Sequence, residues 1–144
     1  MDSLAALTQA LATQARAHRH RHLLLLTGDA DWGRRAATDA LHALTSPAAL
    51  WISSHAPNQA PALPAGQAHQ ALGRDLQALV FDAHDGFDPD ALGAVGGAVV
   101  GGGVLLLLTP PLSDWPAYPD PETRRIAPAL FDPGDVGRRF LHRF

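Results

Sequence analysis

Residues 23–35 of this chain read LLLLTGDADWGRR. The four leucines and Thr27 form a short, continuously apolar segment, which is typical of a strand buried on both faces of a parallel sheet. Gly28 then opens a loop, and the residues after it have the apolar spacing of a helix. Nucleotide-binding α/β proteins hold a phosphate where a strand, a glycine-bearing loop and a helix follow one another. The segment therefore predicts an α/β fold and raises the question of whether a nucleotide is bound.

Three more segments have the composition of buried strands, namely ALWISS (49–54), ALVFDAHDG (78–86) and GGGVLLLLTPP (101–111). Helical segments alternate with them, and one of these should begin at Asp88, because helices favour an acidic cap followed by proline. This alternation predicts a three-layer α/β domain with a mainly parallel sheet of at least four strands. The expected topology is Rossmann-like or P-loop-like, and the expected central strands are 23–27, 78–82 and 104–108.

Two segments lack such a pattern. Residues 55–66 contain three prolines and are predicted to form a loop. Beyond residue 111 the chain is again rich in proline, and a last helix is expected from about Asp135 to the C-terminus.

Composition excludes several kinds of chemistry. The eleven basic residues are all arginine, so no lysine can form a Schiff base or contact a phosphate, and no cysteine can form a disulfide or bind zinc. The formal net charge of −3 provides no general attraction to nucleic acid or to an anionic membrane. The apolar run Val104–Leu108 is too short to span a bilayer, and the N-terminus places its charge after its apolar part, the reverse of a secretory signal. We therefore expect a cytoplasmic protein without a membrane partner.

Polar side chains gather where the predicted strands end. Ligands of open parallel sheets bind at the carboxyl ends of the strands, so these residues are the first candidates for a site. They are Thr27, Gly28, Asp29 and Asp31 after the first strand, Ser53, Ser54 and His55 after the second, Asp82, His84 and Asp85 after the third, and Thr109 after the fourth.

The loop after the first strand is a poor phosphate site. Gly28 and Gly33 are followed by Arg34, but the lysine and the Ser/Thr of a phosphate loop are missing, and Asp29 and Asp31 would repel a phosphate. The two aspartates are better explained as caps for the open N–H groups of the next helix. Gly28, Asp29, Asp31 and Asp82 thus stay weak candidates for cofactor binding, in a topology without a functional P-loop.

Three other interpretations are open at this stage. The acids resemble those of a phosphoacceptor receiver, but such a domain needs a lysine that is absent here. Asp29, Asp31, Asp82 and Asp85 could bind a divalent cation, although aspartates at strand ends are also ordinary caps. The HRHRH segment (18–22) could contact RNA phosphate, and the Trp32 and Trp115 rings could stack on bases, although such residues more often form a solvated edge or pack internally.

A longer segment resembles a known family. Residues 72–116, LGRDLQALVFDAHDGFDPDALGAVGGAVVGGGVLLLLTPPLSDWP, are similar to the N-terminal domain of bacterial tRNA(Met) cytidine acetyltransferases. LLLLTGDADWGRR and the terminal RRFLHRF fit the same domain, so the resemblance covers nearly the whole chain. Such enzymes form N4-acetylcytidine at the wobble position of elongator tRNA(Met), using acetyl-CoA and ATP or GTP with Mg²⁺. Their N-terminal domain precedes a helicase-like ATPase module, an acetyltransferase module and a tRNA-binding tail.

The resemblance implies that residues 1–144 are a single accessory domain, a fragment of a longer enzyme. The nucleotide and acetyl-CoA sites would lie in the later modules, so no catalytic, cofactor or metal residue is transferred to this chain, and no activity of its own is expected. The implied partners are the helicase-like and acetyltransferase modules, with contact to tRNA(Met) left open. Trp115 and Tyr118, aromatic residues set among prolines, are the candidates for an interface and should either fold back over the sheet edge or meet the helicase-like module. The alternative function is an independent nucleotide or small-ligand binder with an acidic metal site at the strand ends.

Overall fold

The structure, a computed structural model, describes residues 2–44 and 49–144. It contains a five-stranded, all-parallel sheet in the order β1-β5-β4-β2-β3. The strands are β1 (His22–Thr27), β2 (Ala49–Ile52), β3 (Ala62–Leu63), β4 (Leu76–Asp82) and β5 (Val99–Thr109). The predicted α/β fold and its parallel sheet are therefore confirmed, and the segments 78–82 and 104–108 lie in the central strands β4 and β5. The prediction that 23–27 is also central is wrong, because among the described strands β1 pairs with β5 alone and forms an edge of the sheet.

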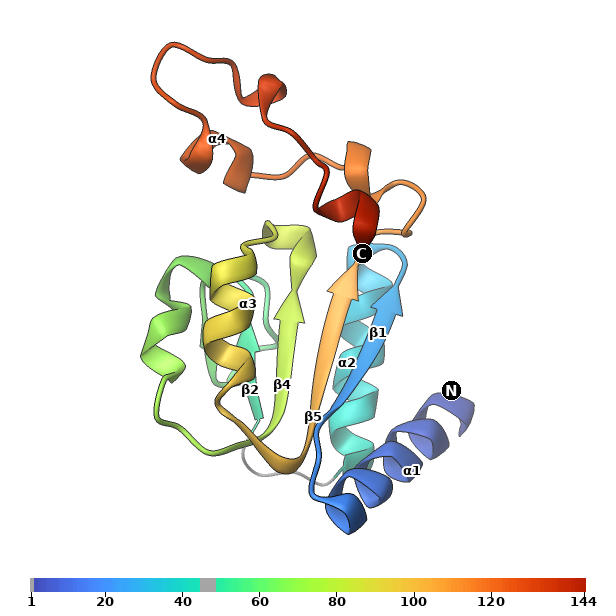
Figure 1. The fold of residues 1–144 in the computed structure, drawn as a ribbon. Coiled ribbons are helices and arrows are strands. Elements are labelled where there is room, and N and C mark those ends of the chain that lie inside the picture. Colours follow the sequence, from blue (N-terminus) through green and yellow to red (C-terminus); the bar gives the residue numbers. More distant parts are fainter. Residues whose placement is uncertain (1, 45–48) are drawn as a thin grey trace.

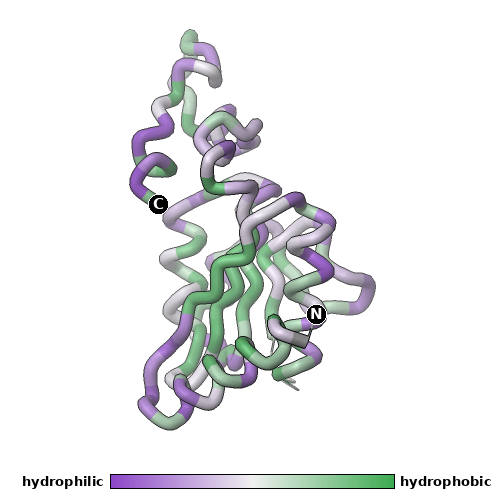
Figure 2. The backbone as a smooth tube through the Cα atoms, turned by 90° about the vertical axis from the view of Figure 1, so that its right-hand side faces the viewer, coloured by the Kyte–Doolittle hydropathy of each residue, from purple (hydrophilic) through white to green (hydrophobic). Residues whose placement is uncertain are grey.

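Helices cover both faces of the sheet and make three layers (Figure 1). α1 (Asp2–His18) and α2 (Ala30–Leu44) lie on one face, and α3 (Pro89–Gly96) and the 3-10 helix η1 (Ala65–Ala71) lie on the other. Side chains of a strand alternate between the two faces, so an apolar run is buried on both. Val80 packs with the α1–α2 layer, whereas Leu79 and Phe81 pack with the α3 layer. Figure 2 shows these apolar strands in the interior of the molecule.

The second half of the sheet differs from the predicted pattern. β3 lies inside the segment predicted as a loop, because its two residues pair with Trp51 and Ile52 and show no periodicity of their own. The strand expected at 78–86 ends at Asp82, whose side chain accepts the His84 N–H at 3.1 Å and starts a 3-10 turn (η2, Ala83–Asp85). The helix cap predicted at Asp88 is confirmed, since its Oδ1 accepts the Asp90 N–H at 2.9 Å.

Residues 110–144 form a C-terminal extension beyond the carboxyl ends of the strands (Figure 1). It holds one short helix, α4 (Glu122–Ile126), and the 3-10 turns η3 (Trp115–Ala117), η4 (Pro133–Asp135) and η5 (Leu141–Arg143). The helix expected from Asp135 is wrong, because Gly134 and Gly137 flank its start and the chain makes only single turns there. Among the described residues, none of the helices is long and apolar enough to cross a membrane.

Candidate functional site

The carboxyl ends of β2 and β4 and the start of α2 bring six polar side chains together. Arg34, Ser53, His55, Asp82, His84 and Asp85 form this strand-end network. Its centre is Asp82, which is 1% exposed and ends the central strand β4. The Asp82 carboxylate accepts hydrogen bonds from Arg34 Nε at 2.7 Å and from His84 Nδ1 at 3.0 Å.

Arg34 also reaches the second carboxylate of the network. Its Nη2 donates to Asp85 Oδ1 at 3.1 Å, so one guanidinium bridges Asp82 and Asp85. Asp85 further accepts the Ser54 N–H at 2.7 Å and lies 2.7 Å from His55 Nδ1. Ser53 Oγ is 3.0 Å from both carboxylates, and its single proton can go to only one of them at a time.

His84 is the second nitrogen-bearing partner of Asp82 in the network. Its Nδ1 faces Asp82 and its Nε2 lies 3.0 Å from the Gly28 carbonyl oxygen, so both ring nitrogens meet acceptors. Burial disfavours the charged ring, but the hydrogen bonds to Asp82 and Gly28 outweigh it and raise the pKa of His84. Burial likewise disfavours the Asp82 carboxylate, while hydrogen bonds from His84, Arg34 and Ser53 hold its pKa below the usual range. Arg34 and His84 thus both favour the ionised form of Asp82.

A pH titration should detect the charge on His84. Because the pKa of His84 is raised on folding, its contribution to stability is complete below its unfolded pKa of about 6.5 and is lost as the pH rises through the folded pKa. We therefore expect the melting temperature to fall as the pH rises above the unfolded pKa of His84, about 6.5, and to fall less steeply in His84→Gln. The matched control is His69→Gln, which changes an exposed histidine and should keep the wild-type slope. Equal slopes in wild type and His84→Gln would contradict a charged His84.

The four weak cofactor candidates lie in different settings. Asp29 Oδ1 accepts the Trp32 N–H at 2.9 Å, which confirms its role as a cap of α2. The side chain of Asp31 is 83% exposed and lies 4.0 Å from Arg34. Gly28 lies against the Trp32 ring, and Asp82 is part of the strand-end network. Within residues 2–44 and 49–144, no three His, Asp or Glu side chains are arranged to hold a metal ion. Of the acids at the strand ends, Asp82 and Asp85 are paired with Arg34.

The sequence predicted most members of the strand-end network but not the pairing of Arg34 with its carboxylates. Ser53, His55, Asp82, His84 and Asp85 were all expected at the strand ends, whereas Arg34 was considered only as a phosphate contact. Its pairing with Asp82 depends on where β4 and α2 lie relative to each other, which no local signal reports. The other strand-end residues stay outside: Thr27 Oγ1 donates to the Pro110 carbonyl at 3.0 Å, and the buried Thr109 hydroxyl has no partner among the described residues.

Trp115 and Tyr118 connect the C-terminal extension to the domain. Trp115 is 3% exposed, and its ring contacts those of Phe87 and Phe144 at centroid distances of 5.1 and 5.3 Å. The half-buried Tyr118 lies edge-on to His84 at 5.9 Å. Of the two arrangements expected for Trp115, the structure shows the one in which the ring folds back onto its own domain.

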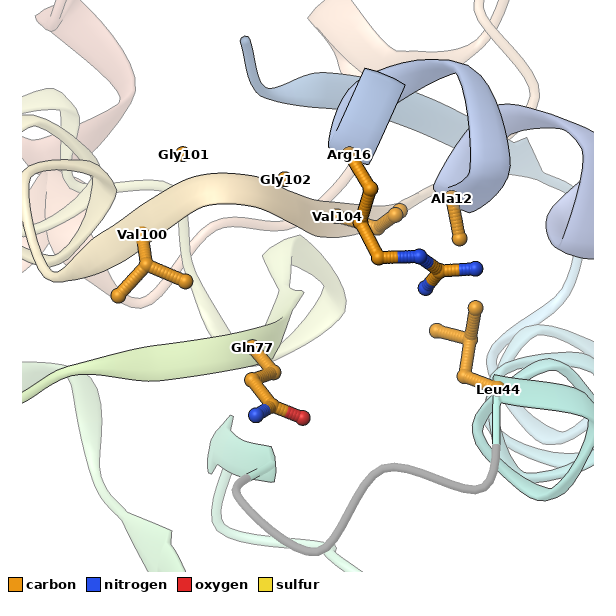
Figure 3. Close-up of a pocket in the computed structure, with 8 residues that line it drawn as sticks. All are labelled: Ala12, Arg16, Leu44, Gln77, Val100, Gly101, Gly102 and Val104. Atoms are coloured by element: carbon orange, nitrogen blue, oxygen red, sulfur yellow. The ribbon is translucent and has the colours of Figure 1, made fainter. Parts of the chain in front are cut away.

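A cavity at the opposite end of the sheet is lined mainly by apolar residues and glycine. It has a volume of about 190 Å³ and lies where α1 meets the glycine-rich start of β5 (Figure 3). Among the described residues that line it, Arg16 is the charged one, and its side chain runs from α1 toward Leu44. Gly102, with a backbone φ of +97°, lets α1 approach, because a Cβ there would lie 3.1 Å from Arg16 Cγ. This cavity therefore reflects helix packing.

Comparison with known proteins identifies the family. The family model described as "tRNA(Met) cytidine acetyltransferase TmcA, N-terminal" matches residues 1–144. The chain belongs to this family. It is 44% identical to the tRNA(Met) cytidine acetyltransferase TmcA of Nitrosococcus halophilus over 99% of its own length and 19% of the relative. For the TmcA proteins of Haloferax volcanii and Salmonella typhimurium, the identities are 39% and 40%, covering 96% and 81% of this chain and 19% and 17% of the relatives.

The chain therefore spans about a fifth of the length of the TmcA relatives it matches. The resemblance seen in the sequence is confirmed, and the chain corresponds to the N-terminal part of the TmcA family.

Proposed function

We propose that this chain is the non-catalytic N-terminal domain of a cytoplasmic enzyme that forms N4-acetylcytidine at the wobble position of elongator tRNA(Met). Its role is to dock on the helicase-like ATPase module of the same protein and to assist tRNA binding. The observation that carries the proposal is the family match over residues 1–144, together with the small share of each relative that the chain covers. In the whole enzyme, acetyl-CoA and ATP or GTP with Mg²⁺ would bind to the other modules.

The residues of this chain do not fit a nucleotide phosphate. In the loop after β1, Asp29 caps the helix with its carboxylate, and the guanidinium of Arg34 is turned toward Asp82 and Asp85. A phosphate needs converging N–H groups and a free cation at this place. We therefore assign no step of the acetylation or of nucleotide hydrolysis to this chain.

The C-terminal extension offers the docking surface. Its exposed large apolar side chains are Leu112, Ile126, Leu130, Phe131, Phe140 and Phe144. Such residues are costly on the surface of a monomer when they gather in one segment, and they mark interaction sites. The proposed occupant is the remainder of the same protein, because the relatives continue for about four times the length that this chain matches.

Leu130 is the most protruding member of this surface. It is 104% exposed and has a backbone φ of +77°, a conformation that costs an L-residue roughly 1–2 kcal/mol. The neighbouring Phe131 is 64% exposed. A strained backbone that presents a leucine to solvent supports a binding role for that side chain. Trp115, a buried residue of the extension that contacts Phe87, would help to hold this surface in place.

Association of the 144-residue chain with the separately produced remaining modules tests the docking proposal. We expect the double change Leu130→Ser and Phe131→Ser to weaken that association about tenfold or more, since apolar anchors dominate interfaces. The control is Leu72→Ser, which removes a leucine that is 62% exposed outside the extension. Formation of N4-acetylcytidine in tRNA(Met), measured by mass spectrometry, should fall with the association. Wild-type association and acetylation in the double variant would refute docking through the extension.

A further inference from the structure

A hollow of about 660 Å³ lies beside the start of α2 and borders the strand-end network at Arg34 and His55. Its walls come from the beginning of α1, the first turns of α2 and the loop after β2. The lining residues that carry the argument are Trp32, Arg35, Asp39, His55 and Pro57. The volume lies within the range of about 300–1,000 Å³ that is usual for small-molecule sites.

Trp32 provides a flat apolar wall. Its side chain is 40% exposed, whereas Trp51 and Trp115 are buried at 2% and 3%. Gly28 leaves room for the ring to pack against the loop, because a Cβ at that position would lie 2.9 Å from Trp32 Cε3. The indole thus rests against the backbone of the loop after β1, with part of its surface open to solvent. An aromatic ring fixed in this way is a stacking platform for a base, since every base has a π-face.

Arg35 provides the charge. Its side chain is exposed, and it makes no hydrogen bond or ion pair with any residue that the structure describes. Arg34, also in the lining, is different because its guanidinium bridges Asp82 and Asp85. Asp39 follows Arg35 by one helical turn in the same wall, so it could accept a hydrogen bond from the amino group of a base.

We propose that this hollow binds one nucleotide of single-stranded RNA, with the base stacked on Trp32 and a neighbouring phosphate against Arg35. The proposal deepens the tRNA-binding part of the function proposed above and rests on it. A nucleoside triphosphate fits less well, because its charge needs several cations, whereas the wall has one uncommitted arginine and the carboxylate of Asp39. One phosphate of an RNA chain carries a single negative charge, which Arg35 can balance.

Tryptophan fluorescence tests the proposal directly, because Trp32 is the exposed indole and the other two tryptophans are buried. The probe is an unstructured RNA of about eight nucleotides. We expect it to quench the emission of the 144-residue chain, and Trp32→Leu to abolish that quenching. Anisotropy of the same RNA with a terminal dye should show roughly tenfold weaker binding to Trp32→Leu.

Salt dependence tests the role of Arg35. Loss of one phosphate contact with a single strand should lower the slope of log K against log salt by about 0.7 in Arg35→Gln. Arg74→Gln is the matched control, since Arg74 is exposed and outside the hollow, and it should keep the wild-type slope. In the whole enzyme, Trp32→Leu should raise the KM for tRNA(Met) and leave kcat unchanged, as expected for a residue that only binds.

Four results would overturn the proposal. They are the absence of quenching by RNA, equal affinity for CMP or ATP and for the oligonucleotide, an unchanged KM for tRNA(Met) in Trp32→Leu, and weaker association of Trp32→Leu with the remaining modules at unchanged RNA affinity. The third result would show that the hollow is not used by the substrate, and the fourth would make it a protein interface. Failure here leaves the Leu130 and Phe131 experiment unaffected, so docking and RNA binding are tested separately.

Discussion

Asp82→Ala is expected to lower the free energy of unfolding by about 3–5 kcal/mol, the cost of removing one partner from a buried ion pair. Asp82 accepts hydrogen bonds from Arg34, Ser53 and His84, and its side chain is fully buried. Without it, the His84 ring keeps only the Gly28 carbonyl as a partner, and Arg34 keeps Asp85. The guanidinium would lose one of the two carboxylates to which it donates, and a buried ring nitrogen of His84 would lose its acceptor. Urea unfolding, followed by circular dichroism, measures the loss.

The matched control is Asp31→Ala, which removes another carboxylate near the same arginine. Asp31 is 83% exposed and 4.0 Å from Arg34, so its ion pair is screened by water and its removal should change stability by less than about 1 kcal/mol. If both alanine variants unfolded at the same urea concentration, the network would not be a stabilising element. The double variant Arg34→Met with Asp82→Leu should recover part of the loss, because it leaves no unpaired charge from this pair in the interior.

The loop after β1 keeps the shape of a phosphate site but uses each residue differently. Gly28 makes room for the Trp32 ring, Asp29 caps α2, and Arg34 turns inward to Asp82. In a phosphate loop, the backbone N–H groups of the helix start are open and a cation points at the ligand. Here a carboxylate satisfies one of those N–H groups and the arginine is neutralised. The topology thus serves packing and charge pairing at the place where related folds bind nucleotides.

Three of the five strands could be predicted because a continuous apolar run leaves a local signal. β1, β4 and β5 contain continuous apolar runs, and such runs are recognisable without knowledge of their partners. The same reasoning placed Asp82 and His84 at the strand ends. The two-residue strand β3 left no such signal, since its place is set by pairing with β2.

The charge pairing in the site could not be predicted from the sequence. Arg34 and Asp82 are 48 residues apart in the chain and meet because α2, which connects β1 to β2, passes over β5 and β4 in the sheet order. That order is a property of the whole fold, so nothing in the local sequence predicts that Arg34 pairs with Asp82. The structure of the C-terminal extension was predicted wrongly for a related reason. Its turns are held by contacts with Phe87 and Trp115, and the local sequence does not show these contacts.

Trp115→Ala is expected to lower the free energy of unfolding by about 3–5 kcal/mol, as is typical when a buried tryptophan is truncated. The ring is 3% exposed and stands edge-on to Phe87, which itself contacts Phe81 in the core and Phe140 and Phe144 in the extension. Its removal would leave a cavity where the extension meets the α3 layer. The loss should therefore be visible as a lower melting temperature of this chain by itself.

Trp32→Ala is the control, because it removes the same side chain from a site that is 40% exposed. Only the part of the ring that lies against Gly28 is lost from packing, so we expect a change of about 1 kcal/mol or less. Trp115 and Trp32 should thus have different roles, the first in stability and the second in RNA binding. Trp115→Ala should unfold the chain more easily and, by loosening the extension, also weaken association with the remaining modules, whereas Trp32→Ala should leave both intact and reduce RNA binding. An unchanged melting temperature in Trp115→Ala would mean that the extension is not packed as the structure shows, and the docking surface formed by Leu130 and Phe131 would then lose its support.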